Sequence, residues 1–127
     1  MNILIDTHIL LRYMTDNLRL KAKYKEQIEN EGNNLFVSKT SFWEITIKVS
    51  LGKLKIEKPI SEFENYFKEK SFNEFDFDHR DLDTLSKLPF YHGDPFDRLI
   101  ISQAINRNLI VISDDPKFKL YPVQLFQ

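Results

Sequence analysis

The residues with the clearest chemical potential are acids placed where helices are expected to begin. Asp94 and Asp97 are three residues apart at the start of an expected helix, and Pro95 occupies its first helical position. Asp94 has the residue type and place of an N-cap, and Asp97 lies one turn further along the same face. Two carboxylates in this arrangement are either good helix capping or part of a metal site.

Further acids follow the expected strands. Asp6 ends the continuous apolar run 2–5, which is typical of a strand buried on both faces. Asp115 comes just after the apolar run 109–113, and Glu44 comes shortly after a third apolar run. Because the carboxyl ends of parallel strands meet at one edge of a sheet, these acids could converge with the first pair on one cleft.

Apolar runs and helical patterns alternate along the chain, which predicts an α/β fold: a three-layer α/β/α sandwich with a mainly parallel central sheet. Ser41 and Glu44 match the S-x-x-E capping box of a helix start. The expected strands are 2–5, 35–38, 72–77, 109–113 and 123–126, and the expected helices are 7–14, 17–31, 40–51, 61–70, 78–88 and 94–107.

The composition excludes several classes of protein. The 127 residues include no cysteine, so disulfides, thiolate zinc sites and cysteine nucleophiles are excluded, and a reducing, cytoplasmic setting is expected. The 18 basic and 19 acidic side chains nearly balance, unlike those of proteins that hold nucleic acid by bulk electrostatics. No apolar run approaches the roughly 20 residues that span a membrane, and the N-terminus lacks the basic start of a signal peptide. We expect one domain over residues 1–127 and no membrane partner.

Hydrolysis assisted by hard cations is the chemistry that suits such a group of acids. Mg²⁺ and Mn²⁺ prefer oxygen ligands and usually bind through a few carboxylates together with a substrate phosphate. Two such ions about 4 Å apart can activate a water and stabilise the leaving oxygen of a phosphodiester. No serine or cysteine nucleophile is then required. Lys48, Lys53 and Arg98 could contact the phosphate, although solvated surface is the default role for each.

A structural role explains the same acids equally well. Aspartate and glutamate are favoured at helix N-termini because the helix dipole and the free N–H groups stabilise them. Asp78 and Asp81 repeat the spacing of Asp94 and Asp97, with nothing around them that indicates a site. The three histidines are too scattered for a metal-binding motif, although His92 could orient the loop before Asp94.

Four segments, in order along nearly the whole chain, resemble the motifs of the PIN-domain ribonuclease family, specifically its VapC-type toxins. One such segment would be weak support, but four in order at domain-wide spacing are specific. The segments are 5–11 (IDTHILL), 41–54 (SFWEITIK followed by LGKL), 92–100 (HGDPFDRLI) and 112–118 (ISDDPKF).

The resemblance implies site residues. Asp6, Glu44 and Asp97 would be the central metal-binding acids, and Asp94 would be a supporting acid. The fold it implies is the PIN-like α/β/α sandwich, and the cofactor it implies is Mg²⁺ or Mn²⁺.

The fourth segment and the partners also come from the resemblance. Asp115 matches the fourth acidic position better than Asp114, but the adjacent pair leaves this position ambiguous. The resemblance further implies an RNA substrate, a homodimer, and an antitoxin protein that blocks the site.

These expectations combine into a metal-dependent endoribonuclease, the toxin of a toxin–antitoxin pair, that cleaves RNA with a metal-activated water. The alternative is a non-catalytic interaction module whose acids only cap helices. A third possibility is a phosphohydrolase with Asp6 as a covalent nucleophile. That class usually has a second acid two residues on, and His8 at that position argues against it.

Overall fold

Five parallel strands form a single sheet in the computed structural model, which describes residues 1–127. Their order across the sheet is β3-β2-β1-β4-β5, and all four neighbouring pairs are parallel. This confirms the predicted parallel sheet. The strands are β1 (Asn2–Ile5), β2 (Asn34–Ser38), β3 (Asn73–Phe75), β4 (Ile110–Ile112) and β5 (Gln124–Leu125).

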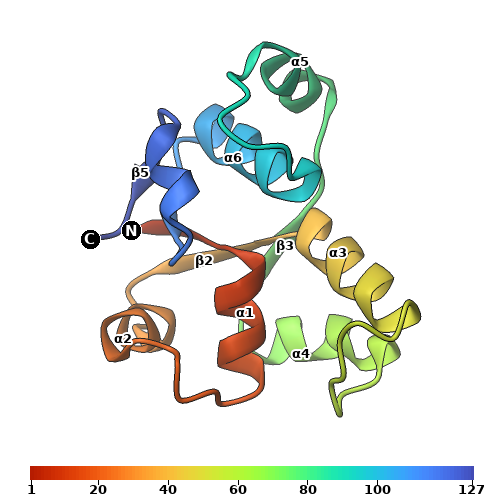
Figure 1. Ribbon diagram of the computed structural model, residues 1–127. Coiled ribbons are helices and arrows are strands. Elements are labelled where there is room, and N and C mark those ends of the chain that lie inside the picture. The colour runs from red at the N-terminus through yellow and green to blue at the C-terminus, as the bar shows by residue number, and fades with distance from the viewer.

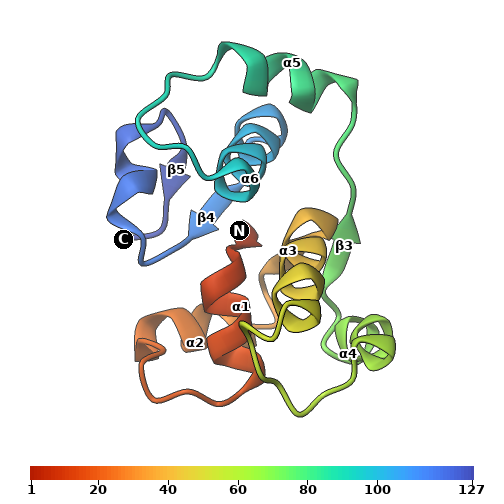
Figure 2. The same cartoon turned by 45° about the vertical axis from the view of Figure 1, so that its right-hand side comes forward.

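Helices lie on both sides of the sheet and complete the expected three layers (Figure 1). On one side are α1, α2 and α4, and on the other are α5 and α6; α3 contacts both α1 and α6 (Figure 2). The helices are α1 (Thr7–Met14), α2 (Ala22–Glu29), α3 (Lys39–Ser50), α4 (Phe63–Glu69), α5 (His79–Lys87) and α6 (Pro95–Arg107), with short 3-10 helices at Ile60–Glu62 and Pro116–Leu120.

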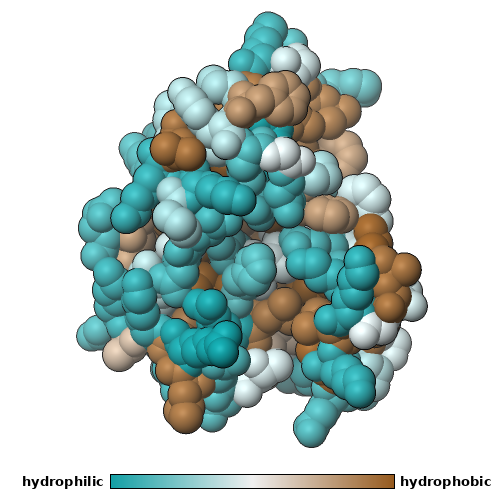
Figure 3. All heavy atoms as spheres, in the orientation of Figure 1, coloured by the Kyte–Doolittle hydropathy of each residue, from teal (hydrophilic) through white to brown (hydrophobic).

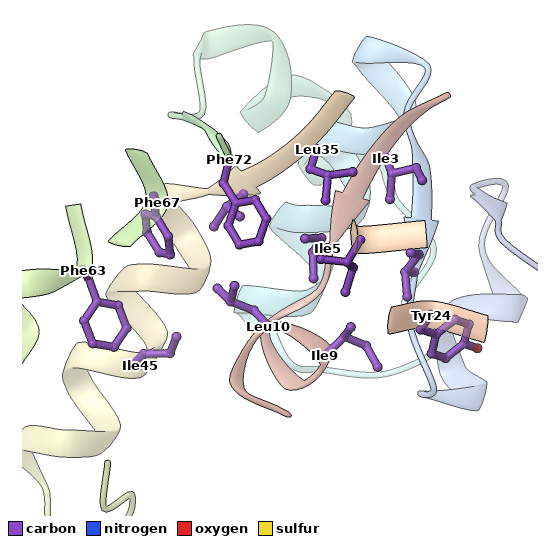
Figure 4. Close-up of a cluster of buried hydrophobic side chains, with 13 residues drawn as sticks. Ile3, Ile5, Ile9, Leu10, Tyr24, Leu35, Ile45, Phe63, Phe67 and Phe72 are labelled. Atoms are coloured by element: carbon purple, nitrogen blue, oxygen red, sulfur yellow. The ribbon is translucent and has the colours of Figure 1, made fainter. Parts of the chain in front are cut away.

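Strand β1 divides the core because successive side chains point to opposite faces of a sheet. Ile3 and Ile5 join the larger apolar cluster, which includes Phe63 and Phe67 on the α4 side. Figure 4 shows these side chains packed together between the sheet and the helices. Leu4 joins the second cluster, on the α6 side. Burial on both faces is what the uninterrupted apolar run of this strand predicted.

The predicted capping box at the start of α3 is wrong. Ser38, the last residue of β2, caps this helix instead, and its hydroxyl accepts a hydrogen bond from the Thr40 N–H at 3.0 Å. The helix therefore begins one residue earlier than predicted. Ser41 accepts a hydrogen bond from the Thr7 hydroxyl at 2.9 Å, and Glu44 lies in the second turn of the helix, away from its N-terminus.

Several predicted elements are shorter in the structure. The predicted helix 17–31 is helical only over Ala22–Glu29, because Asn17 accepts a hydrogen bond from the Arg19 N–H and closes a turn ahead of it. The half-exposed strand 72–77 is reduced to Asn73–Phe75. No helix combines the length and the hydropathy of a membrane span.

Candidate active site

The start of α6 holds Asp94 and Asp97 in different environments. The Asp94 side chain accepts a hydrogen bond from the Asp97 N–H at 3.0 Å, so Asp94 is the N-cap of the helix. Asp97 is only 7% exposed. Burial, followed by the negative charges of Asp94 and Glu44, raises the pKa of Asp97 from 3.8 to about 7. The Asp97 carboxyl group thus lies among other acids without a compensating cation.

Asp6 links the end of β1 to the start of α1. Its side chain accepts a hydrogen bond from the Ile9 N–H at 2.8 Å and caps α1. Only 2% of the residue is exposed. Burial raises the pKa of Asp6 to about 6, although hydrogen bonds from Ser113 and Ile9 act in the opposite direction. The charge of Asp115 raises it as well, so the strand ends bring these two acids near each other.

Glu44 extends from α3 and is 2% exposed. Its Oε2 atom is paired with the Lys48 Nζ atom at 2.8 Å, whereas its Oε1 atom is buried without a hydrogen-bond partner. A buried carboxylate oxygen without a partner is unfavourable unless something else compensates its charge. Since Glu44 caps no helix, helix capping does not account for its position.

The adjacent acids after β4 have separate roles. Asp114 forms ion pairs with Arg12 at 2.8 Å and with Lys21 at 2.9 Å. Asp115 caps the following 3-10 helix through the Lys117 N–H at 2.9 Å. Its charge contributes to the raised pKa of Asp97, and these contacts favour it over Asp114 as the fourth acid of the group.

The acids fit a hydrated hard cation better than a fully coordinated one. The charges of Asp6, Glu44, Asp94 and Asp115 all act on Asp97, but no three Asp, Glu or His side chains are arranged to ligate one ion together. Mg²⁺ keeps several of its waters and is usually bound by one or two carboxylates plus a substrate phosphate. Carboxylate donors and the unpartnered Oε1 atom of Glu44 therefore suit Mg²⁺ or Mn²⁺.

The three basic residues predicted to contact a substrate phosphate differ in their exposure to solvent. Arg98 is 3% exposed and donates hydrogen bonds to the Pro89 carbonyl at 2.8 Å and the Leu88 carbonyl at 3.1 Å. The expectation that Arg98 contacts a substrate phosphate is wrong for this structure, because its guanidinium group is committed inside the protein. Lys53 is exposed, and the Lys48 side chain is 37% exposed beside Glu44.

The Asp78 motif shows how the same spacing can serve structure alone. Asp78 accepts a hydrogen bond from the Asp81 N–H, and the Asp81 side chain accepts one from the Asp78 N–H in return. Asp81 is fully buried and forms a 2.7 Å ion pair with Arg107. Asp97 has no such reciprocal bond and no arginine partner among the contacts of the structure.

Two further features lie beside the acids: an aromatic pair that was not predicted, and His92, which was predicted only as a residue that could orient the loop before Asp94. The rings of Trp43 and Phe96 meet edge to face, with centroids 5.1 Å apart, and join α3 to α6 next to Glu44 and Asp97. The His92 Nε2 atom lies 3.6 Å from Asp97 Oδ2. Trp43 directly precedes Glu44 and Phe96 directly precedes Asp97 in the sequence, which is the signal that could have identified this aromatic pair.

The raised pKa values of Asp6 and Asp97 predict an unusual dependence of stability on pH. An acid with a raised pKa in the folded state stabilises that state while protonated, and this contribution is lost as the pH rises from about 4 to about 7. In EDTA, thermal unfolding should therefore occur at a higher temperature at pH 5 than at pH 7.5. The variant Asp97→Asn should lose much of this difference. A melting temperature that rises over the same interval would contradict the prediction.

Comparison with known proteins places the fold. The PIN domain family model matches residues 3–123. The solved structures of similar fold include VapBC2 from Rickettsia felis, with a TM-score of 0.73 at 18% identity over 99% of this chain and 98% of that chain. VapBC-1 from nontypeable Haemophilus influenzae has a TM-score of 0.71 at 18% identity over 100% and 98% of the two chains.

A third structure, a toxin–antitoxin complex from Klebsiella pneumoniae, has a TM-score of 0.64 at 16% identity over 98% of this chain and 96% of that chain. At these identities the likeness concerns the fold. No curated protein sequence matches this chain significantly. The family match covers nearly the whole chain and agrees with the parallel sheet and with the acids at its edge, so this protein belongs to the PIN domain family.

Proposed function

We propose that residues 1–127 form one nuclease domain that cleaves RNA by metal-dependent hydrolysis. The observation that carries this proposal is the group of buried acids at the carboxyl edge of the sheet. Asp97 has its pKa raised to about 7 by burial and by its acidic neighbours, and Glu44 Oε1 is buried without a partner. Retaining mutually repelling acids in one buried place destabilises the protein, whereas binding a divalent cation compensates their charge.

Asp6, Glu44 and Asp97 would line the site of the cation, Mg²⁺ or Mn²⁺, with one or two of these carboxylates binding it directly and the rest binding through its waters. A bound ion of this kind can activate a water and stabilise the leaving oxygen of a phosphodiester. Asp94 would hold the Asp97 backbone in place through the N-cap bond. The fourth acid, Asp115, would add negative charge at the same edge.

Two lysines with exposed side chains would contact the substrate. Lys48 lies beside Glu44 with 37% of its side chain exposed, and Lys53 is exposed after the end of α3. Each can provide a positive charge to a backbone phosphate. Local contacts of this kind fit a chain whose 18 basic and 19 acidic side chains nearly cancel.

We further infer that the protein is the toxin of a toxin–antitoxin pair, works in the cytoplasm as a homodimer and is blocked by a cognate antitoxin. Support comes from the structures that share its fold, which include VapBC complexes and a toxin–antitoxin complex. The surface also offers places for partners. Figure 3 shows a mainly hydrophilic face with hydrophobic areas near α5 and near the C-terminal end of α3. Phe90 is 81% exposed and Leu51 is 62% exposed.

Cleavage of a fluorescent RNA by the purified protein tests the enzymatic proposal. We expect no cleavage in EDTA and full activity when Mg²⁺ or Mn²⁺ is restored. Asp6→Asn and Glu44→Gln should each lower the rate by more than about 100-fold, beyond the effect typical of residues outside the ligand set. Asp83→Asn is the matched control, because Asp83 is exposed on α5 and pairs only with Lys87. Activity that persists in EDTA would contradict metal dependence.

The second candidate is a non-catalytic interaction module. It is favoured by the capping bonds that Asp6, Asp94 and Asp115 make at their helix starts. This candidate predicts no divalent-cation binding in isothermal titration calorimetry, and a lower melting temperature for every acid-to-amide change. It leaves the buried position of Glu44 unexplained, because Glu44 caps no helix.

A further inference from the structure

Tyr121 is buried just after the 3-10 helix Pro116–Leu120, in contact with His92 and Arg98. Its hydroxyl group is the meeting point of three polar atoms. The His92 backbone N–H donates to it at 3.2 Å, and the Arg98 guanidinium group donates to it at 3.3 Å. The His92 ring nitrogen Nδ1 lies 2.7 Å from the same oxygen.

Counting donors and acceptors fixes the direction of the shortest of these contacts. A hydroxyl group has one hydrogen to donate and two lone pairs that accept. The N–H groups of His92 and Arg98 occupy both lone pairs of the Tyr121 oxygen. The Tyr121 O–H must therefore donate to Nδ1, and Nδ1 of the neutral ring must be the acceptor.

This direction determines the tautomer of His92. In a neutral imidazole one nitrogen carries the hydrogen when the other accepts, so here the hydrogen is on Nε2. The Nε2 atom is buried and has no hydrogen-bond partner, and the His92 side chain is only 5% exposed. Asp97 Oδ2 lies 3.6 Å away, so a movement on the order of half an ångström would bring it within hydrogen-bond range.

We propose that His92 is a positioning residue that directs an Nε2–H group at the Asp97 carboxylate, and that Tyr121 and Arg98 fix the required tautomer. This inference rests on the proposed function in one respect, namely that Asp97 is a metal ligand. A hydrogen bond from a neighbouring group commonly orients a ligating carboxylate, and its loss typically lowers metal affinity by 10–100-fold.

In this arrangement the buried Arg98 helps to position His92. Besides Tyr121, its guanidinium group binds the carbonyls of Leu88 and Pro89, and the Phe90 ring lies over it at 3.8 Å from the centroid. These contacts hold the loop that carries His92. The charge of Arg98 therefore acts through Tyr121 on the ring of His92, rather than on the substrate.

Nitrogen NMR of the metal-free, full-length protein tests the tautomer directly. Long-range proton–nitrogen correlation spectra, recorded at a mildly alkaline pH where imidazole is neutral, should show His92 in the Nε2–H form. Tyr121→Phe removes the hydroxyl donor and should increase the share of the Nδ1–H form. A wild-type His92 in the Nδ1–H form would overturn the proposal, as would a tautomer that Tyr121→Phe leaves unchanged.

Mn²⁺ affinity, measured by calorimetry, tests the positioning role. His92→Leu should weaken Mn²⁺ binding by about 10–100-fold, whereas His92→Gln, whose amide can donate from a similar place, should restore most of it. Equal losses in both variants, or no loss in His92→Leu, would overturn the positioning role. If the wild-type protein binds no Mn²⁺ while His92 is in the Nε2–H form, the proposed function fails and the hydrogen-bond network stands.

Discussion

Replacing Asp97 with asparagine should reduce RNA cleavage by more than about 100-fold and leave the fold intact. The amide keeps the shape of the carboxyl group but removes the charge that a divalent cation requires. The N-cap bond of α6 uses the Asp94 side chain and the Asp97 backbone, so the change leaves the cap in place. Cleavage of a fluorescent RNA in Mg²⁺ or Mn²⁺ measures the effect, with Asp83→Asn as the control.

The stability of the same variant is the more discriminating measurement. The pKa of Asp97 is raised to about 7 by burial and by neighbouring acids, so its ionised form destabilises the folded protein near neutral pH. In EDTA at pH 7.5, Asp97→Asn should therefore melt at a temperature equal to or above that of the wild type. A clear fall in melting temperature would show that Asp97 stabilises the fold, and wild-type cleavage would refute its metal role.

Replacing Asp81 with asparagine should have the opposite profile. Asp81 is fully buried, and its carboxylate accepts hydrogen bonds from Arg107 at 2.7 and 2.9 Å and from Asn106 at 2.9 Å. Asparagine removes the charge that Arg107 pairs with, although Arg107 is 24% exposed and remains 3.5 Å from Asp78. The loss of these charge-assisted hydrogen bonds should lower the free energy of unfolding by about 2 kcal/mol. Urea unfolding at neutral pH measures this loss.

The pH dependence provides a check on the Asp81 prediction. Burial alone would raise the pKa of Asp81, but hydrogen bonds from Arg107 and Asn106 outweigh it and lower the pKa. A lowered pKa stabilises the folded state above the pKa of the unfolded chain, and the contribution is lost as the pH falls below about 4. The stability difference between wild type and Asp81→Asn should shrink in acid. A difference that stays constant down to low pH would contradict this account.

Together the two variants separate metal binding from helix capping. Asp81 and Asp97 occupy the same position in two helices with the same D-x-x-D spacing. If both acids served structure, both amide variants would lower the unfolding free energy. We expect only Asp81→Asn to do so, and we expect cleavage per folded molecule to fall only in Asp97→Asn.

The elements and their order could be predicted from local sequence patterns. Strand and helix periodicities depend on residues within a few positions of one another, and so do helix caps and strand ends. Such local interactions can therefore be recognised from the sequence alone. The strand 2–5 and the helix 7–14 match the predicted bounds. The motif order also predicted the family, and the alternation of elements placed Asp6 and Asp115 at one sheet edge.

The partner of each polar side chain could not be predicted locally, because it depends on how distant segments pack. Asp81 is paired with Arg107, 26 residues away in the sequence. Asp97 occupies the same position of its helix, but the charges that act on it come from other acids. Glu44 has no capping role because Ser38 is the N-cap of α3. The Arg98 guanidinium group is buried and donates hydrogen bonds to the carbonyls of the preceding loop. Burial and charge compensation depend on segments distant in sequence, so the local pattern could propose these acids as ligands or caps but could not distinguish the two.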